Sequence, residues 1–165
     1  MKLHILFFIG FISCLPLYGQ KTIDKLLDKH NQNNIPYLYV DSLAKHYNKF
    51  VLLDSREQKE YQVSHLENAI FVGYYFFSID SVIQKVPDKQ TEIVVYCSLG
   101  MRSEKIANEL KQAGYTHVNN LYGGIFQWKN NDYPVYNKQN KKTDSIHTYS
   151  KSWRKWLKNG IKVYE

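Results

Sequence analysis

The most reactive side chain of this sequence is a cysteine that lies between an apolar run and an amphipathic stretch. Cys97 follows the apolar residues 93–96, and apolar residues then recur at helical spacing as far as Ala113. The loop after the cysteine comprises Ser98, Leu99, Gly100, Met101, Arg102 and Ser103. A thiolate there faces the backbone N–H groups of a tight loop and of a helix N-terminus, and both stabilise a sulfur anion. The pattern therefore predicts a nucleophilic cysteine in an anion-binding loop.

Apolar runs and amphipathic stretches alternate along the middle of the chain and must position this cysteine. The continuous apolar runs at residues 50–53 and 93–96 are typical of strands that are buried on both faces. Short strands are also expected at 38–40, 69–72 and 117–121, and helices at 21–29, 41–47, 58–63, 79–86 and 103–113. This alternation predicts an α/β fold in three layers, with a central, mostly parallel sheet flanked by helices on both faces.

A second group of polar residues follows the first apolar run. Asp54 and Arg56 come directly after it, and His65 lies in a turn further along the chain. Because α/β sheets place their sites at the carboxyl ends of parallel strands, these side chains are candidates for a supporting role around the cysteine loop.

The N-terminus has the features of a secretory signal peptide at residues 1–19. Lys2 supplies a basic start, an apolar run follows from Ile5 to Leu17, and cleavage before Gln20 is expected. We therefore expect an exported protein, periplasmic or secreted; the alternative is a buried N-terminal helix. Cys14 leaves a further alternative, a lipid anchor of the lipoprotein type, which would bring the protein to a membrane.

Removal of this leader would leave Cys97 as the one cysteine of the mature chain. No internal disulfide could then form, and in an oxidising compartment an unpaired thiol is a liability unless it has a chemical role. The cysteine content therefore favours a reactive rather than a structural Cys97.

The net charge of +7 comes almost entirely from the C-terminus. Residues 20–135 carry 13 basic and 13 acidic side chains, whereas residues 136–165 carry eight basic and two acidic ones. The central domain therefore gives no reason to expect nucleic-acid binding. The basic, aromatic extension has two interpretations. It packs back on the domain as a terminal helix and strand, or it is a docking patch for an acidic partner or an anionic membrane surface.

Four blocks of the sequence resemble, in order, the single-domain rhodanese family. They are Asp54-Ser55-Arg56-Glu57, His65-Leu66-Glu67-Asn68-Ala69, the loop from Cys97 to Ser103, and Gly123-Gly124 with Trp128 and Tyr133-Pro134-Val135. The resemblance covers residues 38–135, which leaves residues 20–37 as an N-terminal helix and linker and residues 136–165 as an extension. Ser64 and Asn68 stand where the family usually has glycine, and both are compatible with a turn.

The resemblance implies a sulfurtransferase that needs no metal or organic cofactor. Cys97 would take the outer sulfur of a donor such as thiosulfate as a persulfide and pass it to an acceptor, a small thiol or a protein thiol. Arg102 is expected either to bind the anionic donor or to hold the loop by a salt bridge. The resemblance gives Asp54 and Arg56 a mainly structural role, and the alternative is a direct catalytic role. His65 is expected to stabilise its turn, and the alternative is a general base.

Four further residues, two in the cysteine loop and two in the later glycine pair, have expected structural roles. Leu99 and Met101 could line the entrance to the cysteine loop. Gly123 and Gly124 permit two backbone segments to approach closely, because glycine has no Cβ atom.

Three other functions stay open. Cysteine phosphatases share the strand–loop–helix arrangement, but their loop resembles a pattern one residue longer than the four residues between Cys97 and Arg102. The shorter loop fits a single sulfur atom better than a tetrahedral phosphate. The domain could also be a non-catalytic binding module, although such modules in this family generally lack the cysteine. The third alternative is a persulfide carrier that docks on another protein through the basic extension.

Overall fold

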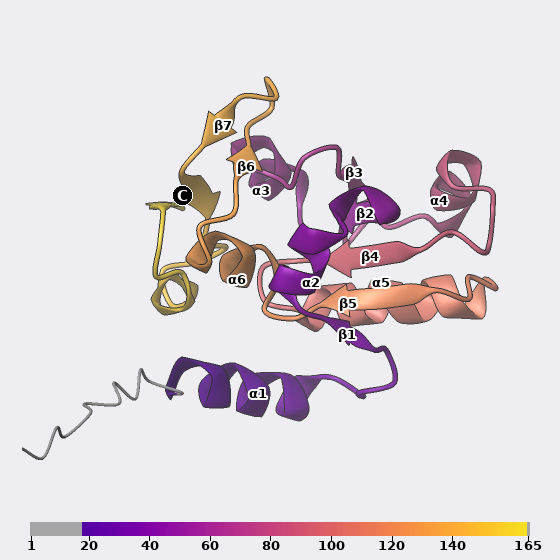
Figure 1. The fold of residues 1–165 in the computed structure, drawn as a ribbon, viewed down its shortest axis with the longest axis horizontal. Helices are drawn as coiled ribbons and strands as arrows, with labels where there is room; N and C mark the ends of the chain where they lie inside the picture. The colour runs from indigo at the N-terminus through magenta and orange to yellow at the C-terminus, as the bar shows by residue number, and fades with distance from the viewer. Residues whose placement is uncertain (1–17, 165) are drawn as a thin grey trace, which may run out of the picture.

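A five-stranded parallel sheet forms the centre of the protein, as the alternation of strands and helices predicts (Figure 1). The computed structural model describes residues 18–164, with side chains from residue 23 onward, so most of the expected leader, including Cys14, lies outside the described residues. The strands run in the order β1 (Tyr37–Leu38), β5 (Val118–Leu121), β4 (Ile93–Tyr96), β2 (Val51–Asp54) and β3 (Ile70–Phe71). All four neighbouring pairs are parallel, and β4 lies in the middle.

Helices cover both faces of this sheet. The helices are α2 (Val40–Lys45), α3 (Gln58–Val63), α4 (Ile79–Lys85), α5 (Met101–Gln112) and α6 (Gly124–Asn130), and η1 (Tyr47–Lys49) is a single 3₁₀ turn. The α2 and α6 helices pack on one face of the sheet, together with Leu52 and Val94. The α4 and α5 helices pack on the other face, with Leu53 and Val95. Successive residues of a strand point to opposite faces, so the unbroken apolar runs of β2 and β4 feed both cores.

The α5 helix begins two residues earlier than the sequence pattern predicts. Its first residue is Met101 and its N-terminal cap is Gly100, whose φ of 116° lies in the left-handed region that favours glycine. Arg102 therefore lies in the first turn of the helix and not in the loop. The helix predicted at 41–47 is α2, which begins one residue earlier, at Val40, and ends at Lys45; its N-cap, Tyr39, makes no side-chain capping bond.

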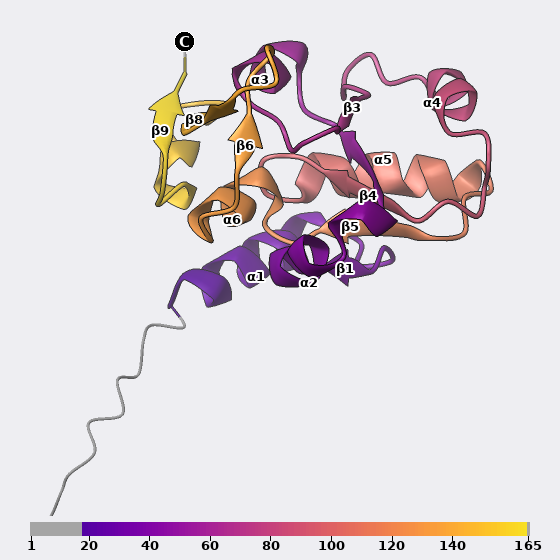
Figure 2. The same cartoon turned by 45° about the horizontal axis from the view of Figure 1, so that its top comes forward.

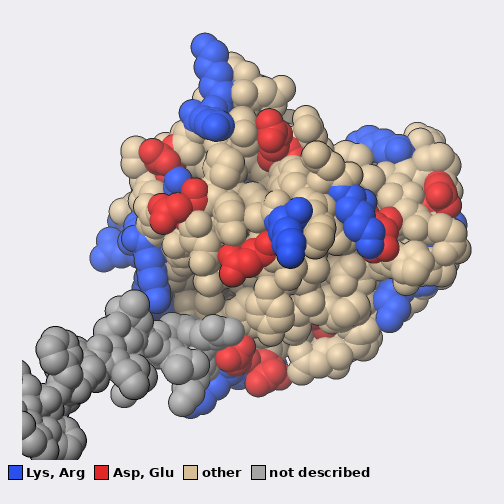
Figure 3. All heavy atoms as spheres, in the orientation of Figure 1, with Lys and Arg blue, Asp and Glu red and all other residues tan. Residues whose placement is uncertain are grey.

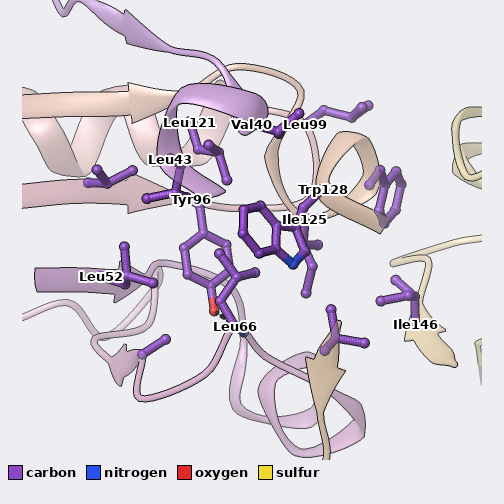
Figure 4. Close-up of a cluster of buried hydrophobic side chains, with 14 of the residues drawn as sticks. Val40, Leu43, Leu52, Leu66, Tyr96, Leu99, Leu121, Ile125, Trp128 and Ile146 are labelled. Carbon is purple, nitrogen blue, oxygen red and sulfur yellow. Dashed lines mark hydrogen bonds between the residues drawn. The ribbon is translucent and has the colours of Figure 1, made fainter. Parts of the chain in front are cut away.

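The C-terminal extension packs on the domain, which is one of its two predicted interpretations. The remaining elements are β6 (Val135–Tyr136), β7 (Lys142–Thr143), β8 (Ser145–His147), η2 (Trp153–Trp156) and β9 (Ile161–Val163). Here β6 pairs with β7 (Figure 1), and β8 pairs with β9 (Figure 2). Ile146 and Leu157 are fully buried in the same core as Trp128. Figure 4 shows Ile146 and Trp128 in this core. An ion pair of 2.6 Å between Lys129 Nζ and Asp144 Oδ1 adds a polar contact.

The N-terminal helix α1 (Tyr18–His30) packs against the β1–β5 side of the sheet. Ile23 and Leu27 bury their side chains there against Tyr122. Within the described residues, no helix has the length and apolar character that crossing a bilayer requires. Acidic and basic side chains are interspersed on the face shown in Figure 3.

Candidate active site

Cys97 lies directly after β4, at the carboxyl edge of the sheet, where the sequence places a reactive thiol. Its Sγ atom accepts a hydrogen bond from the backbone N–H of Gly100 at 3.1 Å and lies 3.5 Å from the hydroxyl of Ser103. Among the described residues it is a free cysteine, and its side chain is almost completely buried. The thiol therefore has the N–H and hydroxyl donors that a sulfur anion needs.

The environment of Cys97 favours the thiolate. Burial raises the pKa of the thiol, but the positive charge of Arg102 and hydrogen bonds from Ser103 and Gly100 outweigh this, so the pKa lies below its ordinary value. A free cysteine, with a pKa of about 8.5, is mostly protonated at neutral pH. The loop therefore increases the fraction of the nucleophilic form.

The N-terminus of α6 holds the first two carbonyl groups of the loop. The N–H of Ile125 donates to Cys97 O at 2.9 Å, and the N–H of Phe126 donates to Ser98 O at 3.2 Å. This approach requires Gly124: a Cβ atom at that position would lie 2.3 Å from Cys97 O. The prediction that the glycine pair permits close backbone approach is confirmed at this residue.

Two asparagines hold the carbonyl group of Gly100 from the other side. Asn120 Nδ2 donates to Gly100 O at 2.8 Å, and Asn31 Nδ2 donates to it at 3.0 Å. Asn120 Oδ1 accepts a hydrogen bond from the Ser103 hydroxyl at 2.7 Å. The single hydroxyl proton of Ser103 therefore has two acceptors, Asn120 Oδ1 and the sulfur of Cys97.

Glu104, which is buried, connects this network to the N-terminal linker. Its Oε1 accepts from the backbone N–H groups of Gln32 and Asn33, both at 3.0 Å, and its Oε2 accepts from Asn120 Nδ2 at 3.3 Å. The sequence analysis did not identify Asn120 or Glu104. Both are polar residues at positions of strand and helix that their neighbours mark as buried, which is the signal that could have identified them.

Arg102 forms a salt bridge with a buried carboxylate, Glu60 of α3. Its Nη1 and Nη2 atoms donate to Glu60 Oε2 and Oε1, both at 2.7 Å, and Nη2 also donates to Ser98 Oγ at 3.0 Å. Burial raises the pKa of Glu60, but the hydrogen bonds and charge of Arg102 outweigh it and lower this pKa from 4.5 to about 2. The loop-holding contact expected of Arg102 is therefore present.

Glu60 was not predicted from the sequence. It occupies the third position of α3 and forms a capping box with Glu57, in which each side chain binds the backbone of the other residue. The spacing Glu57-x-x-Glu60 marks the helix start, but it does not show that the second carboxylate turns inward.

A small cavity of about 150 Å³ opens above the thiol. It is lined by Tyr74, Tyr75, Cys97, Ser98, Leu99, Met101, Arg102, Tyr149 and Trp153. The expectation that Leu99 and Met101 line the entrance is confirmed. Tyr149 and Trp153 come from the C-terminal extension, and the ring of Tyr149 lies 5.1 Å from the guanidinium of Arg102. Their part in the site was not predicted.

Asp54, Arg56 and His65 do not line this cavity. The guanidinium of Arg56 is fully buried and donates to both oxygens of Asp54, with 2.6 Å between Nη2 and Oδ2, and to Ser64 O at 2.6 Å. His65 stacks on Tyr61 and donates from Nδ1 to the Tyr61 carbonyl at 3.0 Å. These contacts hold the loop between β2 and β3. In that loop Asn68 adopts the left-handed conformation, with φ 56°.

The candidate site is thus a thiol site: a free cysteine in a backbone loop at the carboxyl edge of a parallel α/β sheet. Within the described part of the chain, no cluster of three or more His, Cys, Asp or Glu side chains could hold a metal ion. The family model for the rhodanese-like domain matches residues 39–131, which include the whole cysteine loop and more than half of the chain. The chain therefore belongs to the rhodanese-like domain family.

Relatives of this chain have several activities. It is 33% identical over 124 residues to the adenylyltransferase and sulfurtransferase UBA4 of Candida albicans, a match that covers 72% of this chain and 28% of UBA4. It is 35% identical over 101 residues to a tRNA uridine(34) hydroxylase of Buchnera aphidicola, covering 58% of this chain and 31% of that protein. The chain thus matches less than a third of the length of each of these relatives.

Two further comparisons involve thiosulfate sulfurtransferases. The chain is 32% identical over 79 residues to the thiosulfate sulfurtransferase GlpE of Coxiella burnetii, covering 48% of this chain and 71% of GlpE. The crystal structure of a thiosulfate sulfurtransferase from Pseudomonas aeruginosa superposes with a TM-score of 0.59. Its sequence is 22% identical, and the match covers 84% of this chain and 26% of that one, so this likeness supports the fold alone.

Proposed function

We propose that this protein is a sulfurtransferase that carries a sulfane sulfur on Cys97. The observation that carries the proposal is the buried thiol with a lowered pKa, which accepts a backbone N–H of its own loop. The thiolate is the nucleophile in sulfur chemistry, and N–H donors that stabilise it also stabilise a terminal persulfide sulfur. The family membership and the sulfurtransferases among the relatives support the same conclusion.

The proposed reaction has two displacement steps. In the first, the Cys97 thiolate attacks the outer sulfur of a donor such as thiosulfate; the sulfur–sulfur bond of the donor breaks, and sulfite leaves with the electron pair. In the second, an acceptor thiolate attacks the outer sulfur of the persulfide and takes it, so that Cys97 returns as a thiolate. The two steps balance without an external oxidant or reductant and need no metal or organic cofactor.

The loop geometry favours sulfur over phosphate as the transferred group. Only four residues separate Cys97 from Arg102. The guanidinium of Arg102 is also bound at both ends by Glu60 and is not free to clamp a phosphate. These two features support a sulfurtransferase over a phosphatase.

Intact-protein mass spectrometry after incubation with thiosulfate tests the proposal. We expect Cys97 to gain one sulfur atom, which a thiol acceptor then removes, and Cys97→Ser to gain none. Ser42→Ala, at an exposed site outside the cavity, is a control that keeps the nucleophile and should load sulfur as the wild type does. Sulfur loading that persists in Cys97→Ser, or turnover of an aryl phosphate without any sulfur adduct, would overturn the proposal.

We further propose that the protein acts outside the cytoplasm. The basic and apolar leader at residues 1–19 supports export, and the acceptor would then be a thiol of that compartment. Cell fractionation and N-terminal sequencing of the full chain test this. An N-terminus at Gln20 is expected, whereas a lipid-modified Cys14 would place the protein on a membrane, and an uncleaved cytoplasmic protein would refute export.

A further inference from the structure

Four of the nine residues that line the cavity above Cys97 are aromatic, and they come from segments far apart in the sequence. Tyr74 and Tyr75 lie between β3 and α4, whereas Tyr149 and Trp153 belong to the C-terminal extension. The rings of Tyr149 and Trp153 meet edge to face, with 6.0 Å between their centroids. Leu99 adds an apolar surface beside the sulfur. A group that enters the cavity therefore meets flat apolar side chains on two sides.

The charge of this cavity is small for a site that would select an inorganic dianion. Of the described residues that line it, Arg102 is the one with a basic side chain. Both terminal nitrogens of Arg102 bind the Glu60 carboxylate, and the Tyr149 ring lies over the guanidinium. The carboxylate compensates the positive charge, so a doubly charged donor such as thiosulfate gains little from it.

The two aromatic walls border the same cavity. The Tyr149 side chain raises the pKa of Tyr75, in agreement with a short distance between the loop before α4 and the C-terminal extension at the cavity mouth. Tyr75 nevertheless keeps 67% of its surface exposed and Tyr149 keeps 44%, so both rings have free area for a ligand. Large apolar side chains with this much free surface at the entrance to a reactive thiol are typical of a recognition surface.

We propose that this cavity selects organic sulfur donors that carry an aromatic or other flat apolar substituent, which binds between Tyr75 and Tyr149 while the donor sulfur reaches Cys97. The inference rests on the proposed sulfur transfer and specifies its substrate class. The cavity volume of about 150 Å³ suits one aromatic ring, because an apolar cavity of roughly 150 Å³ is enough to bind benzene. The C-terminal extension thereby becomes a specificity element of the site.

Thiosulfonates are suitable probes, because they present one transferable sulfur and a substituent that can be varied. The Cys97 thiolate attacks the outer sulfur of R–SO₂–S⁻, the sulfur–sulfur bond breaks, and the sulfinate R–SO₂⁻ leaves with the electron pair. The persulfide on Cys97 is the same for every R. Benzenethiosulfonate and methanethiosulfonate carry the same single charge and differ only in the substituent that the aromatic walls would contact.

The experiment compares kcat/KM for these two donors at a constant concentration of thiol acceptor. Each value is divided by the rate of the same donor with a small thiol in solution, which removes intrinsic reactivity. We expect the corrected preference for the aryl donor to be about tenfold, equivalent to about 1.4 kcal/mol of transition-state binding. Tyr75→Ala should reduce kcat/KM severalfold for the aryl donor and change it little for the methyl donor.

Phe76→Ala is the matched control, because Phe76 is the next residue, is 93% exposed and does not line the cavity. Tyr149→Asn provides a second variant, since Asn accepts the positive φ of 64° found at this residue and removes the ring. Equal corrected values for the two donors, or equal losses for both donors in Tyr75→Ala, would overturn the inference. Failure of every donor to load Cys97 would instead refute the proposed function, so the two failures are distinguishable.

Discussion

Replacement of Glu60 by Gln tests the coupling between the buried salt bridge and the reactive thiol. The shift of the Glu60 pKa from 4.5 to about 2, at roughly 1.4 kcal/mol per pH unit, corresponds to about 3 kcal/mol of stabilisation at neutral pH. Removal of one partner from a buried ion pair independently costs about 3–5 kcal/mol. We therefore expect Glu60→Gln to lower the free energy of unfolding by about 3 kcal/mol.

The pH dependence of this loss has a definite sign. Because the folded-state pKa of Glu60 is lowered, its contribution is complete above the unfolded pKa of about 4.5 and is lost as the pH falls towards 2. The difference in unfolding free energy between wild type and Glu60→Gln should thus fall, by pH 3, to less than about half of its value at neutral pH. Urea unfolding at several pH values measures it. Glu109→Gln removes the same charge from an exposed position of α5 and should have little effect.

The same substitution should also lower the pKa of the Cys97 thiol. Without the Glu60 carboxylate, the positive charge of Arg102 acts on Cys97 uncompensated and lowers the thiol pKa further. The pH profile of thiol alkylation in the folded variant should therefore move to lower pH. A stability difference that is independent of pH, together with an unchanged alkylation profile, would refute the proposed ionic pair.

Three further predictions concern the loop, the glycines and the extension. Ser103→Ala removes a donor to the sulfur and should move the alkylation profile to higher pH, whereas Ser42→Ala, at an exposed site, should leave it unchanged. Gly124→Ala should destabilise the protein by at least about 3 kcal/mol more than Gly114→Ala in thermal unfolding. Both glycines have positive φ, but only the first meets backbone when a Cβ atom is added. Leu157→Ala should cost about 2–5 kcal/mol, and the exposed Ile161→Ala less than about 0.5, in urea unfolding; similar values for the two would refute a structural role for the extension.

The sequence predicts the parts of the fold that depend on local patterns. The apolar runs of β2 and β4 identify strands buried on both faces, and the position of Cys97 after β4 follows from the same reading. The start of α5 is less accurate, because the left-handed backbone of Gly100 caps the helix in place of a side chain. A glycine cap has no side-chain signature beyond the glycine itself.

The parts of the site that were missed depend on long-range contacts. Glu60 lies in a short helix whose sequence is polar, and only the tertiary packing turns its carboxylate towards Arg102. Tyr149 and Trp153 lie some 50 residues beyond the thiol, and their sequence neighbours are basic and polar. Ile146 and Leu157 are buried in the main core, and their packing positions the two rings at the cavity. No local sequence pattern indicates that geometry.

The contacts of α6 with the cysteine loop orient the backbone dipoles that would stabilise a negative charge on the sulfur. The carbonyls of Cys97 and Ser98 are bound by α6, and the carbonyl of Gly100 by two asparagines. Because a trans peptide holds its N–H opposite its carbonyl, the N–H groups of Ser98, Leu99 and Met101 face away from those partners. Folding therefore orients the loop dipoles before any negative charge arrives, and the reaction itself needs little reorganisation of the backbone. Mutations that shift α6 should consequently appear as changes in thiol reactivity.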